Sequence, residues 1–288
     1  MNREEITELL SCYDIGRIQY IGEISEGNSS FASRIETDRG SYILRRVHGF
    51  KNAMNEYEIG EALWGTGISP CIILTKDGMP YTFCEHIYDL QERMNGQPIA
   101  HITQRLAYEM GKTVIRMRNL LADAQPKFLH VHDRFSLHAK LSEEYFYTLH
   151  TFKGAWDLFG QLHELTEMDY DSSAVVHGDL GIWNLLEDSG KIHIIDYGEA
   201  HLGSPYFDAG ALLFSIIDSV KETEQKQIYD AYLEGCRSES DIDLYELCKA
   251  VHLCTLRGLC AALEFPEPDP LIEGLLQTCA RADALFEK

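Results

Sequence analysis

The first part of the chain alternates apolar and polar residues in short segments, the pattern typical of β-strands. Segments 17–24, 31–37 and 41–47 are rich in β-branched and aromatic residues. Turn-forming residues at 25–30 and 38–40 separate them. The pattern therefore predicts three consecutive antiparallel strands at the front of the chain.

A helix and two further strands are expected next. Residues 52–65 place apolar side chains at near-helical spacing, and Gly67 offers a stop for that helix. Residues 71–74 and 81–87 are again apolar and β-branched, with a turn at 76–78 between them. We therefore expect a five-stranded sheet with one helix over residues 1–90.

From about residue 100 onward the apolar positions follow the 3.6-residue period of helices. The helical segments are 102–121, 142–165, 206–218, 222–236 and 243–263. A strand-loop-strand passage interrupts them between residues 174 and 195. The prediction is an α+β protein with a sheet-containing lobe at 1–90 and a mostly helical lobe at 91–288.

Charge and cysteine content narrow the function classes. The chain carries 25 Lys and Arg against 46 Asp and Glu, a formal charge of −21. Such a surface repels nucleic acid and anionic lipid, and it favours a cationic small-molecule partner. The eight cysteines form no CxxC pair and lie in apolar segments, so we expect buried free thiols rather than disulfides or a zinc site.

Neither a membrane anchor nor a secretory signal is expected. The first residues are acidic where a signal peptide would be basic, and no run of about 18 apolar residues occurs. We therefore expect a cytoplasmic protein that does not bind membranes.

The candidate chemistry lies in the strand-loop-strand passage. The loop contains His177-Gly178-Asp179 and Asn184, and Asp196 follows the second strand. Phosphoryl transfer requires a hydroxyl held in line with the phosphate and neutralisation of the developing charge. Asp179 can accept the proton of a hydroxyl, and the oxygens of Asn184 and Asp196 suit Mg²⁺.

This spacing resembles the His-x-Asp-x-x-x-x-Asn loop and the Asp-x-Gly motif shared by protein kinases and aminoglycoside phosphotransferases. Glycine at position 178 is similar to the small-molecule branch, which includes choline kinase-like enzymes. The resemblance implies a two-lobed protein-kinase-like fold, with Asp179, Asn184 and Asp196 in catalysis. Asn184 and Asp196 would also be the metal ligands. His177 would be structural.

The same resemblance assigns roles elsewhere in the chain. Ser29 and Ser30, in a loop between the first strands, would donate to nucleotide phosphates. Arg45 stands where the family's Val-Ala-Ile-Lys pattern has lysine. It would contact phosphates and pair with an acid of the following helix; Glu56 is the first choice, and Glu58 and Glu61 are the alternatives. Asp208 would brace the catalytic loop from the start of a helix.

The segment 84–87 is similar to the connector between kinase lobes, whose backbone binds adenine. On that match Glu85 and Ile87 would face the base. ATP is the expected nucleotide, with GTP also compatible.

The sequence thus predicts an ATP- and Mg²⁺-dependent phosphotransferase that acts on a hydroxyl of a small molecule. The acceptor classes are an amino sugar, an amino alcohol, a sugar or an antibiotic. The alternative is a catalytically silent kinase-fold module that binds nucleotide or a partner, which the departure at Arg45 favours. The intact set of Asp179, Asn184 and Asp196 favours the enzyme.

Overall fold

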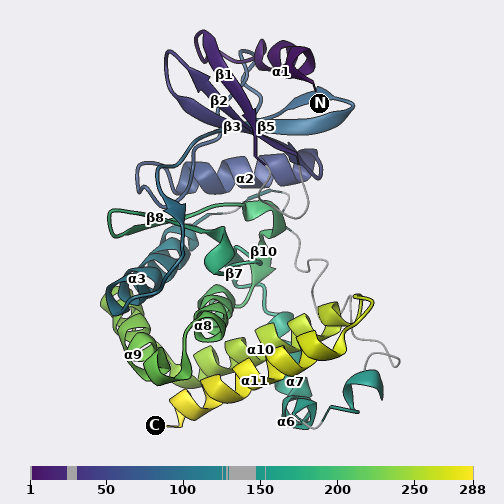
Figure 1. Ribbon diagram of the computed structural model, residues 1–288, viewed down its shortest axis with the longest axis vertical. Helices are drawn as coiled ribbons and strands as arrows, with labels where there is room; N and C mark the ends of the chain where they lie inside the picture. The colour runs from purple at the N-terminus through teal and green to yellow at the C-terminus, as the bar shows by residue number, and fades with distance from the viewer. Residues whose placement is uncertain are drawn as a thin grey trace.

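The protein folds into two lobes, a sheet above and a bundle of helices below (Figure 1). The structure is a computed structural model that describes residues 2–24, 31–124, 126–127, 129, 147–152 and 154–287. Ser29 and Ser30 lie outside the described residues. Within these ranges no helix has the length and apolarity needed to cross a bilayer.

The N-terminal lobe is built on an antiparallel five-stranded sheet of order β1-β2-β3-β5-β4. Its strands are β1 (Ile18–Glu23), β2 (Ala32–Thr37), β3 (Ser41–Val47), β4 (Thr82–Cys84) and β5 (His86–Glu92). Helix α1 (Arg3–Leu10) buries Ile6, Leu9 and Leu10 against apolar residues of the sheet. The predicted fold class is therefore confirmed.

Helix α2 (Phe50–Ala62) lies between the sheet and the helical lobe (Figure 1). Its Ile59, together with Leu63 just after it, belongs to the buried cluster that contains Met110 and Leu212 of the C-terminal lobe. The two lobes therefore share apolar packing through α2, and this packing holds Glu56 of the same helix near the lobe junction.

Two strand predictions need correction. Residues 71–74 form no strand; Ile72 makes only an isolated bridge to Gln91. The predicted strand 81–87 is broken at Glu85, which takes a left-handed conformation (φ 58°) and closes the turn between Cys84 and His86. The extension of β5 to Glu92 was missed because its last residues, Asp-Leu-Gln-Glu, look polar in the sequence.

The connector between the lobes also differs from the prediction. After Glu92 the chain runs through residues 93–96 to β6 (Gln97–Pro98), which pairs with β8 (Leu185–Asp188) of the C-terminal lobe. Segment 84–87 instead forms the β4–β5 turn and the start of β5, at the end of β5 opposite the connector. The division of the chain at residue 90 stays a prediction.

The C-terminal lobe is mostly helical. Its helices are α3 (Gln104–Leu121), α6 (Ala155–Gly160), α7 (Leu162–Asp169), α8 (Phe207–Ser219), α9 (Glu222–Glu239), α10 (Leu244–Ala262) and α11 (Asp269–Phe286). Small sheets pair β7 (Ala174–Val176) with β10 (His201–Gly203), and β8 with β9 (Lys191–Ile194). Nearly all of α8 is buried, so it forms the centre of this lobe.

Helices α3 and α9 approach each other at two glycines. A Cβ added at Gly111 would lie 2.1 Å from the carbonyl oxygen of Tyr232, and one at Gly235 would lie 2.0 Å from that of Tyr108. Backbone atoms cannot move aside as the end of a flexible side chain can. Both positions therefore require a residue without a side chain.

We expect Gly111→Ala to lower the free energy of unfolding by about 2–3 kcal/mol, because the two helices must separate to admit the methyl group. Urea unfolding measures this change. The control is Gly274→Ala in α11, where no atom lies within 4 Å of the added Cβ. That variant should gain up to about 1 kcal/mol from helix propensity. Equal stability of Gly111→Ala and the wild type would contradict the close approach.

Candidate active site

A cleft at the junction of the lobes brings together four of the predicted catalytic and nucleotide-binding residues: Arg45, Glu56, Asp179 and Asp196. Among the described residues it is lined by Arg45, Arg46, Val47, His48, Asn52, Glu56, Asp179, Asp196, Gly198 and Glu199. Asp179 follows β7 and Asp196 follows β9, so the loops after two C-terminal-lobe strands face β3 and α2 of the N-terminal lobe.

Asp208 fixes the start of the loop that carries Asp179. It lies in the first turn of α8, and its buried carboxylate accepts hydrogen bonds from the backbone N–H groups of His177 (2.7 Å) and Gly178 (3.1 Å). Burial raises the pKa of Asp208, against the lowering effects of His177 and these two backbone donors. The helix thus holds the loop through one carboxylate.

The buried ring of His177 joins the catalytic loop to the segment before Asp196. Its Nε2 donates to the carbonyl oxygen of Ile195 (3.0 Å), and its Nδ1 accepts from the backbone N–H of Asp179 (3.3 Å). These two bonds require the tautomer with the proton on Nε2. His177 therefore orients both aspartate-bearing segments and makes no described contact with the cleft.

Position 178 accepts only glycine. Gly178 has φ +84°, and an added Cβ would lie 2.3 Å from the carbonyl oxygen of Glu199. The glycine of the His-Gly-Asp motif thus lets the loop turn against the segment that follows Asp196.

Asp179 is partly withdrawn from water. Its backbone carbonyl accepts from Nδ2 of Asn184 (2.8 Å), and its Oδ2 has a longer contact with the same nitrogen (3.3 Å). Trp183 acts to lower the pKa of this carboxyl group. Burial raises the pKa of Asp179 above 3.8; the charge of Asp196 adds to the rise, while His177 opposes it. A raised pKa makes Asp179 a better proton acceptor than an exposed aspartate.

Asp196 projects into the cleft from a strained backbone. Its φ of 66° and ψ of 69° lie in the left-handed region, which non-glycine residues rarely adopt. Its side chain is 61% exposed, and its Oδ1 lies 3.3 Å from Nη1 of Arg45. Strain of this kind is typical of functional sites, where the surrounding structure holds a side chain in place.

Arg45 is enclosed by acids. Its Nη2 lies 2.5 Å from Oε2 of Glu56 and 2.7 Å from Oδ2 of Asp89, and its Nε donates to Oδ1 of Asp89 (3.2 Å). The predicted partner Glu56 is therefore present. Burial raises the pKa of Glu56 to about 7; Arg45 opposes this rise and Asp89 adds to it.

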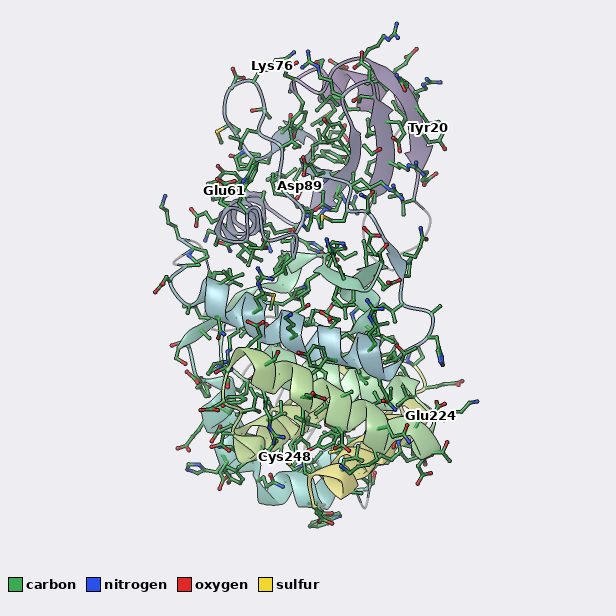
Figure 2. All side chains as sticks on the ribbon, turned by 90° about the vertical axis from the view of Figure 1, so that its left-hand side faces the viewer. Tyr20, Glu61, Lys76, Asp89, Glu224 and Cys248 are labelled. Atoms are coloured by element: carbon green, nitrogen blue, oxygen red, sulfur yellow. The ribbon has the colours of Figure 1, made fainter. Side chains whose placement is uncertain are left out.

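Sequence reasoning missed Asp89, whose side chain is 0% exposed. It lies on β5 directly opposite Arg45 on β3, in the N-terminal lobe where Figure 2 labels it. The polar residues around it gave no signal of a strand, so the predicted strand ends at Ile87, two residues before Asp89.

Two predicted nucleotide contacts fall elsewhere. Glu85 closes the β4–β5 turn, and Ile87 pairs with Val47 and Phe83 within the sheet. Neither residue lies on the connector between the lobes. The prediction that segment 84–87 forms this connector, on which their contact with adenine rested, was therefore wrong.

The chain belongs to the phosphotransferase enzyme family, whose sequence profile matches residues 21–245. This match includes the catalytic loop, Asp196 and Asp208. No curated protein matches the sequence.

Solved structures share the fold over nearly the whole chain. An amicoumacin kinase in complex with AMP-PNP, Ca²⁺ and its antibiotic matches with a TM-score of 0.76 at 14% identity, covering 99% of this chain and 95% of its own. A microcompartment-associated aminopropanol kinase matches with a TM-score of 0.67 at 17% identity (99% and 97% covered). An aminoglycoside phosphotransferase from Alicyclobacillus acidocaldarius gives 0.65 at 14% identity (98% and 94% covered).

We expect Asp89→Asn to lower the free energy of unfolding by about 2 kcal/mol, because a buried charged hydrogen-bond partner of Arg45 is lost. It should also bring the pKa of Glu56 down from about 7, since a like charge is removed. Because the pKa of Glu56 is raised in the folded protein, this carboxyl group stabilises the fold at pH values below its ordinary pKa of 4.5. That contribution is lost as the pH rises through about 7. In the variant this loss should shift to lower pH.

Urea unfolding between pH 5 and pH 8 tests both expectations. The matched control is Asp14→Asn, because Asp14 pairs with Arg39 in solvent and is 75% exposed. That change should alter stability by less than about 1 kcal/mol. A control effect as large as that of Asp89→Asn would argue against a special role for the buried carboxylate.

Proposed function

We propose that the chain transfers the γ-phosphate of ATP, with Mg²⁺, to a hydroxyl group of a small molecule. The observation that carries this proposal is the convergence of Asp179, Asp196 and Arg45 on one cleft. Membership of the phosphotransferase enzyme family supports the reaction class. AMP-PNP in the similar amicoumacin kinase structure supports ATP over GTP as the nucleotide.

Asp179 is the proposed catalytic base. Its carboxylate accepts a hydrogen bond from the acceptor hydroxyl and takes the proton as the oxygen attacks phosphorus. The side-chain N–H of Asn184 contacts this carboxylate and helps to hold it in place. The orientation of the hydroxyl therefore depends on a loop that is already ordered by Asp208 and His177.

Asp196 and Asn184 are the proposed metal ligands. Asp196 offers exposed carboxylate oxygens, and the described hydrogen bonds of the Asn184 side chain use its nitrogen and leave its oxygen available. Oxygen ligands of this kind suit Mg²⁺. Bound Mg²⁺ would neutralise charge on the phosphate oxygens.

The remaining groups bind the nucleotide in this proposal. Arg45 directs Nη1 toward the cleft at Asp196, while Glu56 and Asp89 hold its other nitrogens. It would contact phosphates from that position, as Ser29 and Ser30 would from the first loop. Adenine would be recognised by the backbone of the connector at 93–96, because segment 84–87 does not join the lobes.

For the acceptor we propose a cationic amino alcohol or amino sugar. The formal charge of −21 attracts cations. One structural relative is by name an aminopropanol kinase, and another is an aminoglycoside phosphotransferase.

Asp179→Asn should lower acceptor-dependent nucleotide consumption by at least about 100-fold, since the proton acceptor is lost. The assay uses ATP and Mg²⁺ with a panel of amino alcohols, sugars, homoserine and aminoglycosides. Asp77→Asn, an exposed turn residue of the N-terminal lobe, is the matched control and should keep full activity. If no panel member gives turnover while ATP still raises the melting temperature, the enzyme proposal fails in favour of a nucleotide-binding module.

Asp196→Asn should raise the Mg²⁺ concentration for half-maximal turnover by about tenfold or more, because a neutral amide is a weaker ligand than a carboxylate. Titration of Mg²⁺ at saturating nucleotide measures this shift. An unchanged Mg²⁺ requirement would remove Asp196 from the metal site.

A further inference from the structure

A second cluster of potential metal ligands lies in the C-terminal lobe. Cys248 and His252 stand one turn apart on α10, and Asp283 reaches them from α11. Their ligand atoms all lie within 4.8 Å of one another. Figure 2 labels Cys248 low in the helical lobe, whereas Asp89 lies in the other lobe. None of the three lines the catalytic cleft.

The distances suit a tetrahedral zinc site. Zn–S bonds of about 2.3 Å and Zn–N bonds of about 2.0 Å place the sulfur and nitrogen ligands about 3.5 Å apart. Here Sγ of Cys248 lies 3.7 Å from Nε2 of His252 and 4.0 Å from Oδ1 of Asp283. The Nε2–Oδ1 distance of 2.6 Å is a hydrogen bond, and it must open by roughly 0.7 Å to admit the ion.

A further residue orients the imidazole. Nδ1 of His252 lies 2.9 Å from Oε1 of Gln161, which precedes α7. A hydrogen bond from Nδ1–H to this oxygen leaves Nε2 for a metal, an arrangement that metal-binding histidines share. His252 itself is buried, so its orientation is fixed by these neighbours.

The arrangement differs from a nucleophilic Cys-His-Asp triad. In such a triad the acid contacts the ring nitrogen opposite to the one that faces the nucleophile. Here Cys248 and Asp283 both approach Nε2. Three donors that converge on one point are typical of metal coordination.

We propose that Cys248, His252 and Asp283 bind one Zn²⁺ ion, with water as the fourth ligand. Asp283, whose side chain is 42% exposed, gives the ion and the water access to solvent. Binding replaces the thiol proton and the Nε2–H proton, and both protons leave to solvent. The ion would cross-link α10 to α11. The sequence did not suggest this, because the Cys-x-x-x-His pair contains no CxxC and Asp283 is distant in the chain.

Titration of the full-length, chelator-treated protein under reducing conditions tests the proposal. Calorimetry with Zn²⁺ should show one site that persists in Asp196→Asn, which separates it from the catalytic cleft. Co²⁺ as a spectroscopic probe should produce thiolate charge-transfer absorption. Cys248→Ser should abolish this absorption and weaken Zn²⁺ binding by about 100-fold, and Asp283→Asn should weaken it by about tenfold or more.

The matched control is Cys84→Ser, an exposed thiol that should leave both signals unchanged. Circular dichroism of each variant shows that the fold is retained. Absence of the thiolate absorption in the wild type, or equal Zn²⁺ affinity in the wild type and Cys248→Ser, would overturn the proposal. The readouts use no phosphotransferase substrate, so the result is independent of the proposed reaction.

Discussion

The ion cluster around Arg45 is the interaction on which the arrangement of the cleft depends. One guanidinium contacts acids from three different places: Glu56 of α2, Asp89 of β5 and Asp196 of the C-terminal lobe. A buried charge is tolerated only when it is paired and hydrogen-bonded, so the positions of these elements are coupled. The strand β3, the helix α2 and the loop after β9 are thereby fixed relative to one another. The planar fork of arginine can make these several contacts, whereas an ammonium is a point charge.

The second constraint is the carboxylate of Asp208. By accepting two backbone N–H groups, it orders the loop that carries Asp179, while His177 connects that loop to the segment before Asp196. These contacts are made entirely within the protein. Catalysis by positioning requires such preorganisation, because groups that must be ordered during the reaction would add their entropy to the barrier.

The sequence predicted the parts of the site whose chemistry is local. The loop from His177 to Asn184 and the segment at Asp196 are recognisable because their spacing in the chain is set by two short strands. The connector was misplaced because Glu85 breaks an apolar run at an unexpected point, and its left-handed turn has no glycine to mark it. Asp89 was missed because its partner, Arg45, is 44 residues away, and only strand pairing brings them together. The cluster of Cys248, His252 and Asp283 could not be predicted for the same reason, because only the packing of α10 against α11 brings Asp283 to the other two residues.

The charge of the cleft links nucleotide and metal binding. Its described lining holds two arginines, at 45 and 46, and four acids, at 56, 179, 196 and 199, with Asp89 behind Arg45. Arg45 is already engaged by carboxylates, so little of its charge remains for a polyphosphate. In the proposed reaction, a nucleotide that entered alone would meet net repulsion, and a divalent cation held by Asp196 would reduce that repulsion. On this proposal, arginine in place of lysine at position 45 would strengthen the internal ion cluster and leave more of the phosphate binding to the metal.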